Sequence, residues 1–104
     1  MEIVYASLRR RPGGTAGANE AAEVVDALWA HALPADGLQH ASTLPADDRI
    51  DLLVYLLSRD PSDGPDAAGR AHDLIARSHR TSPLLRGRYL PPEPLPADEG
   101  TTIS

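Results

Sequence analysis

The chain has 104 residues, of which 41% are hydrophobic, and a formal net charge of −5. This length and composition predict one folded domain and exclude a chain that is disordered throughout. The absence of cysteine excludes disulfides, thiolate catalysis and cysteine-bound zinc or iron–sulfur sites. The basic residues are all arginine, and this composition is typical of a GC-rich bacterial genome.

The N-terminal segment predicts a short strand. Residues 2–8, EIVYASL, begin with β-branched and aromatic side chains, which favour strands. The basic run Arg9–Arg11 follows these residues, whereas a signal peptide carries its basic residues first. Because no stretch approaches the roughly 20 apolar residues of a membrane span, we expect a cytoplasmic protein without membrane contact.

Residues 20–33 predict the first helix. Asn19 is the expected N-cap, and Glu20 and Glu23 suit the positive end of a helix dipole. The apolar residues recur at helical spacing and form one stripe. They are Ala21, Val24, Val25, Leu28, Trp29 and Ala32.

Residues 35–44, which follow the first helix, are expected to form a loop. The most apolar run, IDLLVYLL at residues 50–57, predicts a second helix within residues 45–59. Among its residues only Ile50 and Val54 are β-branched, and leucine favours helix over strand. Leu53 is expected to face the first helix. The opposite side of this helix is also apolar and therefore needs a cover from elsewhere.

A third helix is predicted over residues 65–80, beginning at Pro65 and Asp66. Beyond it, residues 82–85 can form one turn, and the proline-rich stretch RYLPPEPLP favours an extended path. The last residues, ADEGTTIS, are typical of a solvated tail.

These elements together predict a mostly α fold: a small three-helix domain with a short N-terminal strand and an extended proline-rich C-terminal arm. We expect the strand and a flexible connector in residues 1–18, the three-helix domain in 19–81, and the arm and tail in 82–104. A lone strand needs a pairing partner. It can pair with residues 86–90 or add to a sheet on another molecule, and the second alternative is preferred.

Histidines and acidic residues offer little chemistry. His31, His40, His72 and His79 are expected at the surface or beside apolar stripes. His72 and His79 are two helical turns apart, about 10.5 Å between Cα atoms, which is too far for one metal ion. Asp47, Asp48 and Asp51 are interpreted as acids at a helix start.

Two loops resemble ligand-binding motifs only superficially. DPSDGPD, at residues 60–66, lacks the closing glutamate of a calcium loop. RPGGTAG, at residues 11–17, lacks the lysine of a phosphate loop, although an anion at the following helix start remains an alternative. No catalytic motif, cofactor or metal site is therefore expected.

An arginine-rich face on the third helix and the segment after it could meet an acidic partner. Nucleic acid is the weaker alternative, because residues 20–69 carry a strong net negative charge that repels phosphate. The candidate contacts are Arg70, Arg77, Arg80, Arg86 and Arg88.

The leading hypothesis is a non-catalytic interaction or regulatory module, such as an adaptor, that buries apolar helix and arm surface against a protein partner or in a homodimer. The alternative is a nucleic-acid-associated regulator that uses the arginine face. The residues expected to meet a protein partner are Leu52, Tyr55, Leu56, Leu84, Leu85, Tyr89 and Leu90.

Overall fold

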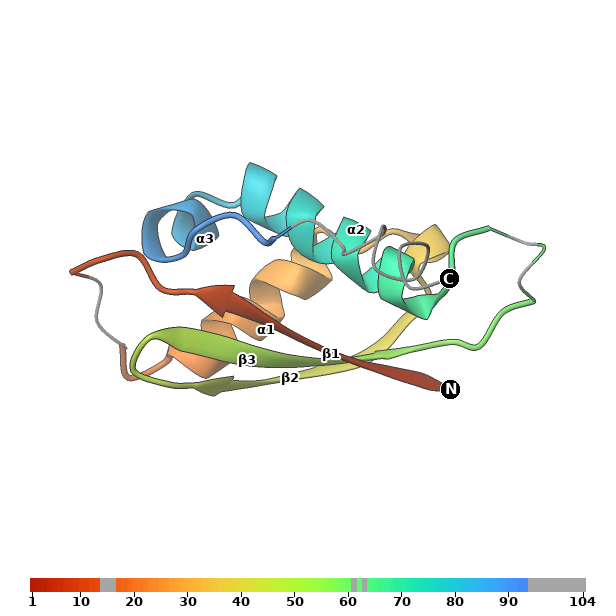
Figure 1. Cartoon of the computed structure of the whole chain (residues 1–104), viewed down its shortest axis with the longest axis horizontal. Helices are drawn as coiled ribbons and strands as arrows, with labels where there is room; N and C mark the ends of the chain where they lie inside the picture. The colour runs from red at the N-terminus through yellow and green to blue at the C-terminus, as the bar shows by residue number, and fades with distance from the viewer. Residues whose placement is uncertain (14–16, 61, 63, 94–104) are drawn as a thin grey trace, which may run out of the picture.

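A computed structural model describes residues 1–13, 17–60, 62 and 64–93 (Figure 1). Its elements, in chain order, are β1 (Glu2–Arg9), α1 (Glu20–Ala30), the 3₁₀ helix η1 (Pro34–Asp36), β2 (Leu38–Pro45), β3 (Arg49–Leu56), α2 (Ala67–Thr81) and α3 (Pro83–Arg88). The fold is therefore α+β, with a three-stranded antiparallel sheet. The mostly α prediction is wrong.

The strands lie in the order β1-β3-β2, and β3 is antiparallel to both neighbours. β1 and β2 consequently run parallel to each other, and α1 connects them in a split β-α-β unit. Ala6 lies opposite Leu52 in the first pairing, and Leu52 lies opposite Thr43 in the second. The central strand, β3, contains most of the apolar run at residues 50–57.

The prediction of a helix over residues 45–59 fails at β3. Its even-numbered residues, Ile50 to Leu56, are fully buried, whereas its odd-numbered side chains reach the other face. Because the outward side chains Leu53 and Tyr55 are also apolar, the two-residue alternation of a strand is hidden in the sequence. Pairing on both edges outweighs the helix propensity of leucine.

The helices of the described residues pack against one face of the sheet (Figure 1). Even-numbered side chains of β1 and β3 meet Val24 and Leu28 of α1, Leu74 and Ile75 of α2, and Leu85 of α3. The core is built from aliphatic side chains with one buried tyrosine, Tyr89.

Two predicted helices are confirmed, and one predicted loop is wrong. α1 and α2 match the expected positions, and the side chain of Asp66 caps α2 by accepting a hydrogen bond from Gly69 N at 2.8 Å. Residues 35–44 are not a loop, because they contain most of β2. Their sequence has few β-branched residues, so only the pairing with β3 identifies them as a strand.

β1 belongs to the same sheet as β2 and β3, because it pairs with β3 along its whole length. The preferred expectation, that this strand finds its pairing partner on another molecule, is therefore wrong. The alternative partner, residues 86–90, contributes only the single Arg10–Tyr89 bridge. α3 also joins this unit, since Leu85 and Tyr89 contribute fully buried side chains to the core.

Candidate protein-interaction surface

The sheet has one face that none of the described helices covers. We call it the open face. It carries the odd-numbered side chains of β1 and β3 and the even-numbered side chains of β2 from His40 to Leu44, as the pairing Tyr5–Leu53–Ser42 illustrates. Leu38 precedes a register shift in β2 and is buried in the core instead. Its large apolar residues include Ile3, Tyr5 and Leu44, which are 60%, 63% and 68% exposed, and Leu53 and Tyr55 lie between them on the central strand.

One end of the open face holds a small polar cluster. Tyr5 donates its hydroxyl hydrogen to Asp51 Oδ1 at 2.9 Å, and Arg49 Nε donates to the same oxygen at 2.8 Å. Hydrogen bonds from Tyr5 and Arg49 lower the pKa of Asp51. Asp51 therefore stays ionised while it orients both neighbouring side chains.

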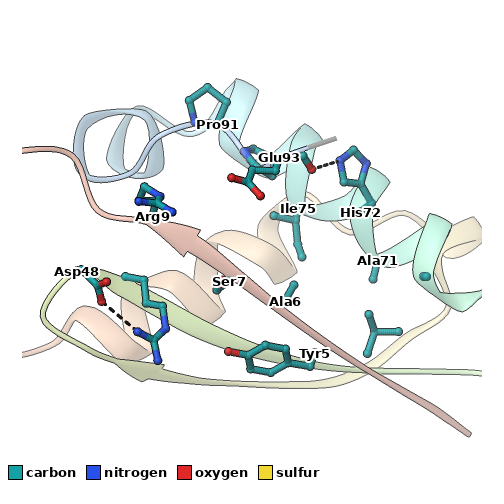
Figure 2. Close-up of a pocket in the computed structure, with 14 residues that line it drawn as sticks. Tyr5, Ala6, Ser7, Arg9, Asp48, Ala71, His72, Ile75, Pro91 and Glu93 are labelled. Carbon is teal, nitrogen blue, oxygen red and sulfur yellow. Dashed lines mark hydrogen bonds and ion pairs between the residues drawn. The ribbon is translucent and has the colours of Figure 1, made fainter. Parts of the chain in front are cut away.

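Beside the open face, the free edge of β1 borders a groove of about 400 Å³ (Figure 2). Val4 and Ala6 of β1 line it from one side, and Ala68, Ala71 and Ile75 of α2 from the other. Residues 91–93 form a further wall, where His72 Nε2 lies 3.1 Å from the carbonyl oxygen of Glu93. The groove thus runs between a strand edge and a helix. Small apolar side chains and prolines form about half of its lining, and polar or charged side chains, among them Arg9, Asp48, Arg49 and Glu93, form the rest.

A buried polar cluster fixes one end of the sheet. Arg10 and Glu20 form an ion pair at 2.6 Å between Nη1 and Oε2, and Tyr89 donates its hydroxyl hydrogen to Glu20 Oε2. Arg10 also donates to the carbonyl oxygens of Ala46 and Asp47 in the β2–β3 turn, at 2.7 and 3.2 Å. This cluster joins β1, the start of α1, the turn and the end of α3.

The ionisation of this cluster follows from its contacts. Burial by itself raises the pKa of Glu20, but hydrogen bonds from Arg10 and Tyr89 outweigh it and leave the pKa below its ordinary value. Burial and the neighbouring Glu20 raise the pKa of Tyr89 well above its ordinary value. Both groups therefore keep their ordinary charge states near neutral pH, and their role in this arrangement is to hold the elements together.

The structure divides the residues expected to meet a protein partner. Leu52, Leu56, Leu85 and Tyr89 are fully buried in the core, so they are not available to a partner in this fold. Leu84, within α3, and Leu90, just after it, are partly buried. Tyr55 alone of this set lies on the open face, where its ring centroid is 5.2 Å from that of His40.

Three of the five candidate arginines are engaged within the fold. Arg77 forms a bidentate pair with the buried Asp36, at 2.9 and 3.2 Å, and Arg88 pairs with Glu23 at 2.7 Å. Arg70 is buried and donates to the carbonyl oxygen of Asp36 at 3.1 Å. Arg80 and Arg86 are exposed. The five side chains therefore do not form one continuous solvent-facing surface.

The histidines lie in separate places. His31 Nδ1 is 2.8 Å from the carbonyl oxygen of Ala27, and the buried His79 Nε2 is 2.9 Å from that of Tyr89. Among residues 1–13, 17–60, 62 and 64–93, no cluster of three or more histidine, aspartate or glutamate side chains has the arrangement needed to hold a metal ion.

The acidic and loop motifs have different outcomes. Asp47 and Asp48 lie in the turn between β2 and β3 and Asp51 lies within β3, so their interpretation as helix-start acids is wrong. The glycine-rich and DPSDGPD segments each lie partly outside the described residues.

The main residues of the open face were not predicted from the sequence. Ile3, Tyr5 and Leu44 were assigned to a strand or a loop without a role, and Leu53 was assigned to the interior. The signal that could have found them is the alternation in β1, where Val4, Ala6 and Leu8 turn inward and Ile3, Tyr5 and Ser7 outward.

Comparison of the chain with protein-family models, with curated protein sequences and with solved structures found no significant match. Within the part of the chain that the structure describes, the helices are all too short or too polar to cross a bilayer.

Proposed function

We propose that this protein is a non-catalytic protein-interaction module that buries the open face of its sheet against a protein partner or a second copy. The observation that carries the proposal is the group of large apolar side chains on this face. Ile3, Tyr5 and Leu44 each expose more than half of their surface there. Large exposed apolar side chains gathered on one face are typical of a protein–protein contact.

Charge on the open face favours the same function. The chain has a net charge of −5, but the only acidic side chain among the strand positions of this face, Asp51, is paired with Arg49. Another protein surface can therefore approach without burying an unpaired carboxylate, which would cost several kcal/mol of binding free energy.

The size of the face limits the expected affinity. Strands of eight residues give a face roughly 26 Å long and, with neighbouring strands about 4.8 Å apart, roughly 14 Å wide. The area of a face with this length and width is smaller than the roughly 800 Å² that each partner buries in a standard interface. We therefore expect a weak contact or one that extends past the sheet, for example onto its edge.

Sedimentation equilibrium tests the case of a second copy. The wild-type mass should rise with concentration, Leu44→Asp should abolish the rise, and Leu33→Asp should preserve it. Leu33 is a control because it is 50% exposed but lies outside the sheet. Circular dichroism should show that all three proteins are folded. A mass that rises equally in the Leu44→Asp variant would contradict the use of this face.

A rise in salt separates apolar association from the arginine-based alternative. Burial of the open face should persist in high salt, because it depends mainly on apolar area. Binding to nucleic acid phosphates should instead weaken steeply as salt increases. Association with nucleic acid that follows the second pattern, and that depends on Arg80 and Arg86, would replace the proposed function.

A further inference from the structure

The backbone at the free edge of β1 has unused hydrogen-bonding groups. Arg10 N donates to Asp48 O on the side of β3, whereas Arg9 O accepts from Leu90 N on the opposite side. Since successive residues of a strand direct their backbone groups to opposite edges, Ile3, Tyr5 and Ser7 direct theirs away from β3. Among the described residues, no backbone group pairs with them there.

An isolated antiparallel bridge lies beside β1, and no strand follows it in residues 90–93. Leu90 N donates to Arg9 O at 2.8 Å, and Arg11 N donates to Arg88 O at 2.9 Å, around an antiparallel bridge between Arg10 and Tyr89. The chain then turns toward α2, where the carbonyl oxygen of Glu93 lies against His72. Residues 91–93 therefore border the groove without extending the sheet.

The sequence after Tyr89 is unsuited to extend this bridge into a strand. If the register of the Arg10–Tyr89 bridge continued, Pro92 would lie opposite Ser7, Pro94 opposite Tyr5 and Pro96 opposite Ile3. These are the positions that would need to donate backbone hydrogens to β1, and proline has no N–H. The chain's own C-terminal residues are thus poorly suited to complete the ladder.

A second copy is also poorly suited to this edge. α2 lies over the strand position next to β1 and lines the groove with Ala68, Ala71 and Ile75 (Figure 2). Paired β1 strands would be about 4.8 Å apart, whereas packed helices need roughly 8–10 Å between their axes. Two copies related by a twofold axis through β1 would bring both α2 helices into the same space.

We infer that the edge of β1 binds an extended peptide segment of a partner protein, which adds to the sheet as its fourth strand beneath α2. The inference rests on the proposed function, because it names the kind of partner. Ile3, Tyr5 and Ser7 supply the backbone contacts. Alternate side chains of the peptide enter the groove, where Ala6, Ala68 and Ile75 favour small or branched apolar residues. The charged part of the lining, which includes Arg9, Asp48, Arg49 and Glu93, is available for polar contacts with the same peptide.

The test is selection of a displayed library of random nine-residue peptides on the full chain. Enriched peptides should alternate small apolar with other residues, and a synthetic copy should bind. Its binding should be retained by Ser7→Ala and lost, by at least tenfold, in Ser7→Pro, which removes one N–H from the free edge only. Ala68→Trp, at an exposed position in the groove wall, should also abolish binding.

Equal binding by Ser7→Pro, or failure of the library to enrich any such peptide, would overturn the inference. Amide hydrogen exchange in the full chain without peptide supplies a second readout, since the Ile3, Tyr5 and Ser7 amides should exchange rapidly. If these amides are protected at every protein concentration, the chain's own tail occupies the groove. If their protection grows with protein concentration, a second copy occupies it. Either result would contradict binding of a partner peptide there.

The Leu44→Asp variant distinguishes the two proposals. Leu44 lies on β2, across the sheet from the edge of β1. If Leu44→Asp abolishes association through the open face but the variant still binds the peptide, the open face and the edge of β1 are two separate binding surfaces. Peptide binding that disappears with Leu44→Asp, in a folded protein, would contradict a groove at the edge of β1.

Discussion

The Nη1 atom of Arg10 lies 2.6 Å from Oε2 of Glu20, and both side chains are withdrawn from water. This ion pair connects the end of β1 to the start of α1, and Arg10 extends it to the turn that joins β2 and β3. The buried ion pair therefore lies at the same end of the sheet as the isolated bridge between Arg10 and Tyr89.

Glu20→Gln should strongly destabilise the protein, because it leaves the guanidinium of Arg10 buried without a counter-charge. Removal of one partner from a buried pair typically costs about 3–5 kcal/mol. Urea unfolding followed by circular dichroism measures the loss. Glu23→Gln is the control, since its pair with Arg88 is partly solvent-exposed and should contribute less than about 1 kcal/mol. Equal losses in the two variants would contradict a special role for the buried pair.

The pH dependence of stability should differ between the wild type and Glu20→Gln. The pKa of Glu20 in the folded state lies below its ordinary value of 4.5. A lowered pKa stabilises the folded state above the unfolded pKa, and this contribution is lost as pH falls through the folded pKa. Between about pH 7 and about pH 3, the unfolding free energy of the wild type should therefore drop more than that of the Glu20→Gln variant. Parallel curves of unfolding free energy against pH for the two proteins would contradict a stabilising role for ionised Glu20.

Tyr89→Phe should cost about 1.5–3 kcal/mol, the range for a hydrogen bond to a charged group. Because both residues belong to one cluster, its effect should be smaller in the Glu20→Gln background, and a double-mutant cycle measures this coupling. Additive losses would mean that the Tyr89 hydroxyl acts independently of Glu20.

Leu52→Asp should unfold the domain, whereas Leu53→Asp should leave it folded and weaken association. The side chain of Leu52 is fully buried against the helices, while Leu53 is 37% exposed on the open face. Burial of an unpaired carboxylate at position 52 exceeds what a small domain can tolerate. Thermal unfolding of the two variants gives the comparison. The opposite order of stabilities would indicate that residues 50–57 do form a helix.

Deletion of residues 1–9 should abolish cooperative unfolding, because β1 pairs with β3 along its length and supplies the buried Leu8. The helical signal in circular dichroism should fall together with the strand signal. Retention of a folded helical core after this deletion would show that β1 is a separable appendage.

The sequence predicted the elements whose pattern is local. α1 and α2 have apolar residues at helical spacing and acidic or proline residues at their starts, and both helices are confirmed. β2 and β3 depend on contacts that are distant in the sequence, such as the pairing of Ala6 with Leu52. In β3, Leu53 and Tyr55 on the open face obscured the alternation, so the surface proposed for a partner is also what made the strand resemble a helix.

The candidate site could not be found from composition or motifs. Tyr5 and Leu44 come from β1 and β2 and lie on one face only because β3 separates and aligns them. The pair of Arg10 and Glu20 likewise depends on the approach of β1 to α1. Charged residues in a sequence are usually assigned to the surface, and nothing near either residue signals its burial.

Site-directed photo-crosslinking in living cells of the source organism tests the open face most directly. A photoreactive amino acid would replace Leu44 on the open face or Leu33 outside the sheet, and crosslinked products would be identified by mass spectrometry. We expect a discrete protein product from position 44, either a dimer of this chain or one partner, and no such product from position 33. The Leu53→Asp substitution should suppress it. No product from position 44, or the same products from both positions, would contradict the assignment of the open face as a protein-interaction surface.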